Sequence, residues 1–305
     1  MDATLVNTDT AMELDGPQSL LERLPTEIRL MIYNELLFNG CTDDSPVGRL
    51  ARVMPAACDY YEYEYLKRSA DSPCAKPSPS PVLKIRTEEP SSYEQRRPLH
   101  RRTSFKIRSD RFRARCMSTT YHLLSAREIS TTFLLSNARI HAEAAGVLYS
   151  SHVFDFDTHV EAIVPFFSDL TALARSCVRA VRIVKRALPY EKEFDRAEWS
   201  SALSYLAENV PLQSLSLGIV AGMPGPDGWQ MVPPYQSRDF ELLKELDGME
   251  WIKDVLAIQG LERLHVDAVV EHCPPPMSAA MANYIRFSAS IDCAFAEFLT
   301  QKLLA

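Results

Sequence analysis

The chain of 305 residues has no long apolar run, since no stretch approaches the roughly 18 consecutive apolar residues that a membrane-spanning helix needs. Its first residues are acidic and polar, and they lack the basic and then apolar pattern of a secretory leader. We predict that residues 1–18 form a disordered acidic leader. These absences favour an intracellular protein, in the nucleus or the cytoplasm, with no membrane partner.

Regular cysteine spacing is also missing. The seven cysteines are scattered, odd in number and never spaced as C-x-x-C, which argues against both a disulfide framework and a structural zinc site. Such cysteine usage is typical of a reducing compartment. We expect no metal and no other cofactor.

The sequence contains no G-x-S-x-G elbow, Walker loop, HExxH helix or kinase motif set. Without these motifs nothing in the sequence indicates an activated nucleophile or a phosphate cradle. We therefore expect no catalytic residue, and a protein that is not an enzyme.

One segment, HVFDFDTH at residues 152–159, could still carry acid–base or metal chemistry. On a strand, Asp155, Asp157 and His159 would share one face, and two carboxylates with an imidazole are suitable hard-metal or proton-transfer groups. The simpler alternative is an edge strand whose Phe154 and Phe156 point inward and whose polar side chains point outward. We favour this alternative.

The net charge of -7 is unevenly distributed. Residues 76–127 contain 13 Lys and Arg against 4 Asp and Glu, a balance of +9, so the rest of the chain carries -16. The Pro/Ser tract 69–81 precedes most of this basic stretch and cannot sustain a helix or a packed core. We predict that residues 41–125 are a low-complexity basic insert, largely disordered.

Aromatic side chains interrupt this basic tract, and such a tract could contact the phosphates and bases of nucleic acid. The acidic remainder of the molecule would repel the same phosphates. We do not expect nucleic-acid binding, although a nucleic-acid-associated regulator acting through the insert is one alternative.

The most regular pattern is LLERLPTEIRLMIYNELL, within the predicted helical segment 19–40. Pro25 suits a first helical position, where its missing N–H is harmless. Leu24, Ile28, Ile32 and Leu36 recur every four residues and form one apolar stripe. The sequence therefore predicts a helix that begins near Pro25 and ends near residue 39.

Residues 126–305 alternate between helix-like and strand-like patterns. A first helix is predicted around residues 129–149, and amphipathic helices are predicted at 193–210 and 237–259, the latter with Leu242, Leu246, Ile252 and Leu256 facing inward. Three strand-like segments share the spacing L-x-x-L-x-L: Val178, Val181 and Ile183; Leu212, Leu215 and Leu217; Leu261, Leu264 and Val266. Alternation of this kind predicts an α+β or α/β fold with a parallel sheet, built from irregular leucine-rich-repeat-like helix–strand units. A final helix over 277–303 would cap the sheet edge.

Two segments resemble a known family. Residues 20–37 resemble the first half of an F-box in the LPxEIRxxIYxxLL form that is common in filamentous fungal proteins. The segment LLSNARIHAEAAGVLYSSHVFDF, at residues 134–156, looks like the LLxxNRQIxxEAxxxLYxxNxFxF block that follows in those proteins. The chain is thus similar to F-box-like proteins with an N-terminal helical module.

This resemblance implies that the helical module docks on a Skp-type adaptor of a cullin-RING ubiquitin ligase, while the C-terminal part recruits a protein client. The implied adaptor contacts are Leu24, Pro25, Ile28, Ile32 and Leu36. Two alternatives stay open at this stage. The same apolar face could pack inside the protein against the helix at 129–149, or the chain could be an interaction scaffold without a ligase.

Overall fold

The computed structural model of the protein describes residues 20–38, 81–87, 101–109, 112–124, 134, 137–186, 193–224, 229 and 232–304. The predicted leader, 1–18, lies outside these residues. The elements in the first half of the chain are α1 (Thr26–Phe38), β1 (Val82–Thr87), β2 (Arg101–Ser109), β3 (Phe112–Leu124), α4 (Ala138–Ser151) and β4 (Val153–Asp157). Those in the second half are the 3₁₀ turn η3 (Val160–Ala162), α5 (Ile163–Asp169), α6 (Ala172–Cys177), β5 (Ala180–Lys185), α7 (Glu193–Asn209), β6 (Ser214–Pro224), the 3₁₀ turn η4 (Ser237–Asp239), α8 (Phe240–Leu243), α9 (Trp251–Leu256), β7 (Arg263–Cys273), α10 (Ala279–Ser288), the π-helix η5 (Ile291–Phe295) and α11 (Ala296–Leu303).

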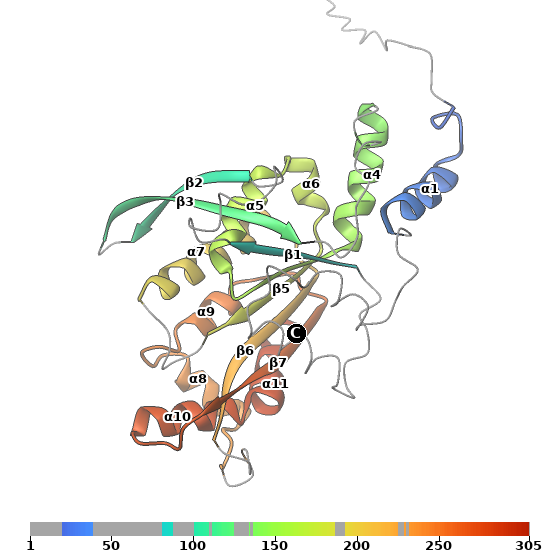
Figure 1. Cartoon of the computed structure of the whole chain (residues 1–305). Coiled ribbons are helices and arrows are strands. Elements are labelled where there is room, and N and C mark those ends of the chain that lie inside the picture. The colour runs from blue at the N-terminus through green and yellow to red at the C-terminus, as the bar shows by residue number, and fades with distance from the viewer. Residues whose placement is uncertain are drawn as a thin grey trace, which may run out of the picture.

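The centre of the fold is a seven-stranded sheet with the strand order β2-β3-β1-β4-β5-β6-β7 (Figure 1). The strands β1, β4, β5, β6 and β7 pair in parallel, while β3 pairs antiparallel with both β1 and β2. A helical segment lies between each two consecutive parallel strands from β4 onward, as parallel crossovers require. The predicted mixture of helices with a parallel sheet is confirmed.

The three L-x-x-L-x-L segments occupy matching positions in this sheet. Val181 pairs with Leu215, which pairs with Leu264. Two residues further along, Leu217 pairs with Ile183 of β5 and with Val266 of β7. Because side chains alternate between the two faces of a strand, these matched residues all point to the same face. The helices cover this face, which places the main core there.

The helices α5, α7 and α9 follow one another along one side of the sheet (Figure 1). Each contributes buried side chains to the same core as the strands, among them Phe167, Leu203 and Ile252. Parallel crossovers between neighbouring strands are almost always right-handed, so consecutive crossovers deliver their helices to the same face. The opposite face carries the polar members of the strands, such as Asp155, Arg182 and Ser216.

The prediction of a largely disordered insert at 41–125 is wrong for the strands that lie within it. β1 pairs in parallel with β4 and antiparallel with β3, and its Leu83 and Ile85 are buried. The short alternating run VLKIRT follows directly after the Pro/Ser tract, and β2 and β3 are rich in arginine. The charged residues made the period-two pattern of these strands difficult to recognise in the sequence. Pairing with neighbouring strands in the sheet stabilises the strands.

The single helix predicted at 237–259 is also wrong. The segment is divided into η4, α8 and α9, and Gly248, at φ 84°, lies in the left-handed region between α8 and α9. A glycine adopts this conformation without steric cost, and it lies in the non-helical stretch between the end of α8 at Leu243 and the start of α9 at Trp251. Ile252 is buried, but Leu242 and Leu246 are 78% and 52% exposed rather than inward.

The C-terminal helical region packs beside β7, but it is not one helix. The segment predicted at 277–303 is divided into α10, η5 and α11, and its apolar residues Ile285, Ile291, Phe295 and Leu299 are buried. Asp292 of η5 accepts the backbone N–H of Ala268 on β7 at 2.7 Å. This contact satisfies a donor at the sheet edge, which is how edge strands are commonly protected.

Two glycines of the fold are expected to respond oppositely to alanine. At Gly222 a Cβ would lie 2.5 Å from Cε1 of Tyr284 and 3.0 Å from Sγ of Cys273, so overpacking should destabilise Gly222→Ala by about 1–3 kcal/mol. At Gly146, inside α4, a Cβ would meet nothing within 4 Å, and the better helix propensity of alanine should stabilise Gly146→Ala by roughly 0.5–1 kcal/mol. Urea unfolding of both variants measures the sign of each change in stability. Changes of the same sign would contradict the prediction.

Candidate docking surface

The helix α1 uses one face to pack against α4. Tyr33 and Leu37 are buried in a small cluster with Ile140, Ala144 and Leu148 of α4. This cluster is separate from the main core under the sheet, and α4 lies between α1 and α6 (Figure 1). Within the described residues, the helix α1 therefore has an internal partner on this face.

The helix α4 begins where the sequence marks a cap. Asn137 accepts the backbone N–H of Ile140 at 2.8 Å, the contact expected of an N-cap residue. The helix starts at Ala138, later than the predicted 129, and the stripe of Ile140, Ala144 and Leu148 is buried. Ala142, near the middle of the predicted helix 129–149, is exposed.

A partly buried ion pair joins α1 to α4. The Nε and Nη2 atoms of Arg29 donate to the two carboxylate oxygens of Glu143 at 2.8 and 2.7 Å, and Tyr33 donates its hydroxyl to Glu143 at 3.1 Å. Arg29 is only 1% exposed. Two parallel N–H···O bonds hold both the distance and the orientation of the partners, so this pair positions α1 on α4.

The same arginine organises the turn before α1. Its guanidinium donates to the backbone carbonyl of Leu24, to that of Glu22 at 3.4 Å and to the hydroxyl of Thr26 at 3.0 Å. These bonds tie the residues before the helix to its first turn. Arg29 thereby determines where Leu24 lies relative to the rest of α1.

The hydrogen bonds from Arg29 lower the pKa of Glu143 from 4.5 to about 2. Because the pKa is lower in the folded state, the contribution of this pair to stability is complete above pH 4.5 and is lost as the pH falls through about 2. We expect Glu143→Gln to be less stable than the unmodified chain at neutral pH, by an amount that shrinks between pH 4.5 and 2. Urea unfolding at stepped pH values measures this difference.

A matched control is Glu297→Gln, which changes a glutamate exposed on α11. Surface substitutions of this kind usually change stability by less than about 0.5 kcal/mol. A difference for Glu143→Gln that stays constant or grows toward low pH would contradict the role given to the ion pair.

The opposite face of α1 is apolar and exposed. Leu24, Ile28 and Leu36 are 36%, 42% and 46% exposed, Pro25 is exposed, and Ile32 is half-buried. All five residues implied as adaptor contacts thus lie on or beside the accessible side of the helix. The structure does not use Leu24, Ile28 or Leu36 as internal core.

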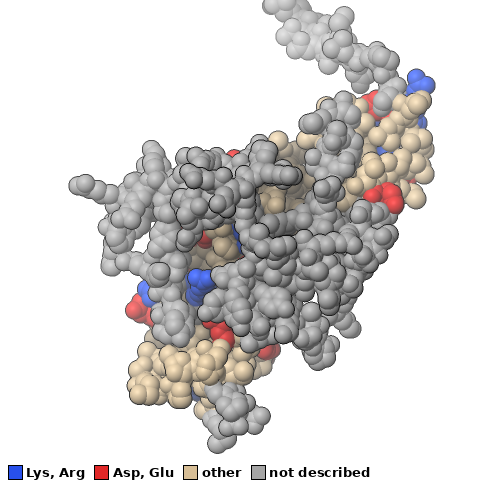
Figure 2. All heavy atoms as spheres, in the orientation of Figure 1, with Lys and Arg blue, Asp and Glu red and all other residues tan. Residues whose placement is uncertain are grey.

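Two further apolar residues extend this surface. Met31 is 67% and Leu20 is 81% exposed. Figure 2 shows a mostly uncharged surface in the region of α1, and the exposed charged residues of the segment are Arg23, Glu27 and Glu35. We call Leu20, Leu24, Pro25, Ile28, Met31, Ile32 and Leu36 the α1 surface.

The residues that position the α1 surface were not identified from the sequence. Arg29 interrupts an otherwise apolar run, and Glu143 lies in an alanine-rich helix, so each is a charged residue in an apolar context. This apolar context indicates that each of the two residues has a partner, because a charge next to core positions generally needs one. The sequence does not indicate which charge is the partner.

The segment HVFDFDTH does not form the metal or acid–base group considered above. Phe154 and Phe156 point inward, as favoured, but β4 is a central strand between β1 and β5 rather than an edge. Asp155 is buried, and the Nη2 atom of Arg86 lies 3.3 Å from its carboxylate and 3.7 Å from that of Asp157. A cation on an adjacent strand therefore balances the two carboxylates.

His159 lies in a different set of contacts. Its Nδ1 is 2.7 Å from the hydroxyl of Thr87, which also donates to Glu161. Across the described ranges of the chain, no group of three or more His, Cys, Asp or Glu residues is arranged to hold a metal ion. The three residues Asp155, Asp157 and His159 are thus not brought together as one site.

Comparison with protein-family models, with curated proteins and with solved structures gives no match for this chain. Within the part of the chain that the structure describes, no helix combines the length and the apolarity needed to cross a membrane.

Proposed function

We propose that this protein is an F-box-like, substrate-recruiting subunit of a cullin-RING ubiquitin ligase, and that the α1 surface docks on a Skp-type adaptor. One observation carries the proposal. The helix α1 packs on α4 through Tyr33 and Leu37, held by Arg29, and still exposes Leu24, Ile28 and Leu36 on its other side. An apolar helix face that the fold does not bury is suited to a groove on a partner.

The apolar composition of the α1 surface supports docking. Single exposed apolar residues are normal on proteins, but contiguous apolar patches rimmed by polar residues commonly mark interaction sites. Burying a Leu, Ile or Met side chain fully contributes about 1.5–3 kcal/mol. Several such residues on one helix can therefore supply a large part of the affinity for a partner.

The contact between the two family-like segments also supports the proposal. Arg29 belongs to the first segment and Glu143 to the second, and they bond directly although the predicted insert separates them in sequence. A long insertion between two packed helices costs little additional loop entropy. The insert therefore does not prevent the two segments from acting as one helical module.

In this proposal the chain has no catalytic residue, and its C-terminal region holds the client. The parallel strands β5, β6 and β7 with their in-register leucine positions would act as irregular leucine-rich-repeat-like units that present a client-binding surface. The mechanism is an increase in effective concentration, because a client held by the same chain as the ligase is close to it.

Co-expression tests the proposal directly. The full chain should co-purify with a Skp-type adaptor and a cullin as one complex in size-exclusion chromatography, in equal amounts of chain and adaptor. Migration of the chain alone, with the adaptor in a separate peak, would reject the ligase function and leave an interaction scaffold.

A further inference from the structure

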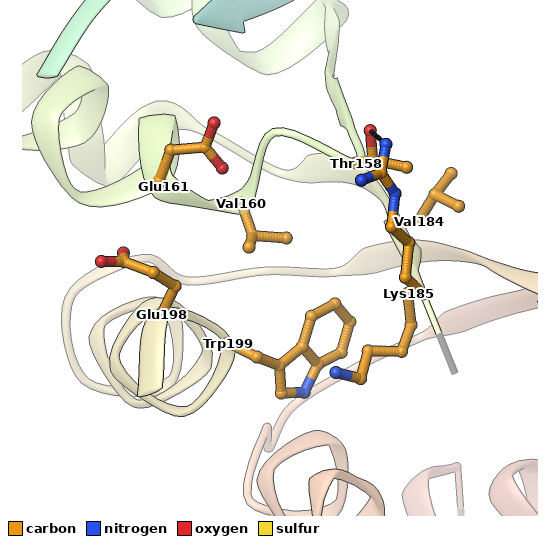
Figure 3. A pocket seen from close by; sticks show the side chains of 8 residues that line it. Thr158, Val160, Glu161, Val184, Lys185, Glu198 and Trp199 are labelled. Carbon is orange, nitrogen blue, oxygen red and sulfur yellow. Dashed lines mark hydrogen bonds between the residues drawn. The ribbon is translucent and has the colours of Figure 1, made fainter. Parts of the chain in front are cut away.

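A charged side chain in the middle of the sheet is stabilised by contacts inside the chain. Lys185, the last residue of the central strand β5, is 2% exposed, and its Nζ lies 4.9 Å from the ring centroid of Trp199. Figure 3 shows these two side chains beside a cavity of about 40 Å³. The edge of the sheet differs, because polar backbone groups there need a partner from outside the sheet.

The strand β7 forms one edge of the sheet (Figure 1). The N–H of Arg263 donates to the carbonyl just before β6, whereas the N–H of Ala268 points the other way, to Asp292. Because successive residues of a strand direct their backbone groups to opposite sides, Leu264 and Val266 direct their N–H and C=O groups away from β6. In the part of the chain that the structure describes, no strand pairs with these groups.

The open part of this edge is short. Asp292 of η5 accepts the N–H of Ala268 at 2.7 Å, so the open part ends at Asp267. We call residues 263–267 the β7 edge; each of them is exposed or only partly buried. An edge with unpaired backbone groups is a template for one additional strand.

The β7 edge carries opposite charges at its two ends. Arg263, His265 and Asp267 alternate onto the same face of the sheet, with the histidine midway between the two charged residues. Arg263 is exposed. The side chain of Asp267 is 31% exposed, and within the described residues its Oδ1 accepts no hydrogen bond. An antiparallel copy of the same segment, centred on His265, would therefore place each arginine opposite an aspartate.

We propose that two copies of the chain pair through their β7 edges, antiparallel and about a twofold axis at His265. In this register Leu264 lies opposite Val266 of the second copy, and both direct their N–H and C=O groups across the interface. The two residues exchange two hydrogen bonds, which the twofold symmetry repeats. Arg263 lies opposite Asp267 of the second copy in the closer type of antiparallel pair, where opposite charges attract.

Charge complementarity favours this register over its neighbour. A twofold axis at Leu264 would also pair outward backbone groups, but it would place Arg263 opposite His265 and leave Asp267 without the added cation. The interface is small, since a standard interface has about 20–30 residues a side. We therefore expect a weak dimer, with a dissociation constant on the order of 100 µM.

Sedimentation equilibrium of the full chain, at concentrations up to about 500 µM, measures this dimer. Arg263→Glu and Asp267→Lys should each weaken it at least about tenfold, because like charges then face each other twice. An equimolar mixture of the two variants should restore the dimer, since each mixed pair again has opposite charges. The matched control Arg238→Glu changes an arginine that is 82% exposed outside β7 and should leave the dimer unchanged.

The variant Val266→Pro keeps the test decisive even if Asp267→Lys fails to fold. It removes an N–H that points away from β6, and proline is tolerated at such positions of an edge strand. Thermal unfolding should show a folded chain, while the dimer is weakened at least about tenfold. A chain that stays monomeric at every concentration, or an unchanged dimer in both Arg263→Glu and Val266→Pro, would overturn the proposal.

The exposed α1 surface is the other place where two copies could associate. A chain with Ile28→Asp and Leu36→Asp should dimerise as the unmodified chain does, because neither residue lies near β7 in the sheet. Loss of the dimer in this variant would place the contact on the α1 surface and overturn the pairing of β7 edges. Failure to bind an adaptor would reject the proposed function and leave this dimer unaffected.

Discussion

The double substitution Ile28→Asp and Leu36→Asp is expected to weaken capture of a Skp-type adaptor by at least about 100-fold, with little change in the stability of the chain. Both side chains lie on the accessible side of α1, at 42% and 46% exposure, and neither belongs to the cluster with α4. Two carboxylates in an apolar docking surface would have to be desolvated on binding without a partner charge. The unbound chain leaves them in water.

The measurement combines pull-down of the adaptor with thermal unfolding of the same preparations. Leu242→Asp with Leu246→Asp is the matched control, because these two leucines are also exposed but lie in and after α8, away from the α1 surface. The control should retain adaptor binding. If the substitutions in α1 instead lower the unfolding midpoint and leave binding intact, then Ile28 and Leu36 are structural and the docking proposal fails.

The second large effect is expected at Phe295, where Phe295→Ala should destabilise the fold by about 3–5 kcal/mol. Phe295 lies in the π-helix η5 and is fully buried, with ring centroids 4.9 Å from Phe240 and 5.8 Å from Trp251. Phe287 and Phe298 also pack on it. Truncation therefore removes apolar contacts with four different helices, α8, α9, α10 and α11, and leaves a cavity that cannot collapse easily.

Urea unfolding measures this loss. The control Met277→Ala removes a side chain that is 92% exposed and should change stability by less than about 0.5 kcal/mol. A change for Phe295→Ala as small as that of the control would mean that the C-terminal helices are not part of the main core. Loss of adaptor binding is not expected for Phe295→Ala under conditions in which the chain stays folded, since α1 packs in a separate cluster.

The spacing L-x-x-L-x-L predicts three strands and the inward residues on each. The predictions succeed fully for β5 and β6, because a strand inside a parallel sheet places every second side chain on the covered face, and Val181, Ile183, Leu215 and Leu217 are buried there. On the edge strand β7 the matching residues Leu264 and Val266 pair in register with β6 but are only partly buried. The periodicity of a segment is sufficient to predict its inward residues where the buried residues recur with the period of that strand or helix.

The strands β1, β2 and β3 show where local periodicity is insufficient. Their segments are short or rich in arginine. β2 and β3 pair with each other, and β1 joins them to the rest of the sheet through residues that are distant in sequence, as Leu83 pairs with Phe154. Arg86 is a clear example, because its charge reads as part of a solvated basic insert although its side chain is buried beside Asp155. A buried ion pair between distant residues has no local signal.

By itself, the sequence of α1 determined a helix with an apolar stripe, since the four-residue spacing from Leu24 to Leu36 and the proline at its start are local properties. It could not determine whether that stripe is core or surface. Only the tertiary structure decided this, because Glu143 in α4 holds Arg29 and thereby turns Tyr33 and Leu37 inward and Ile28 and Leu36 outward. Exposure depends on which distant element occupies the other side of a helix, and that choice is made by packing and charge pairing across the fold.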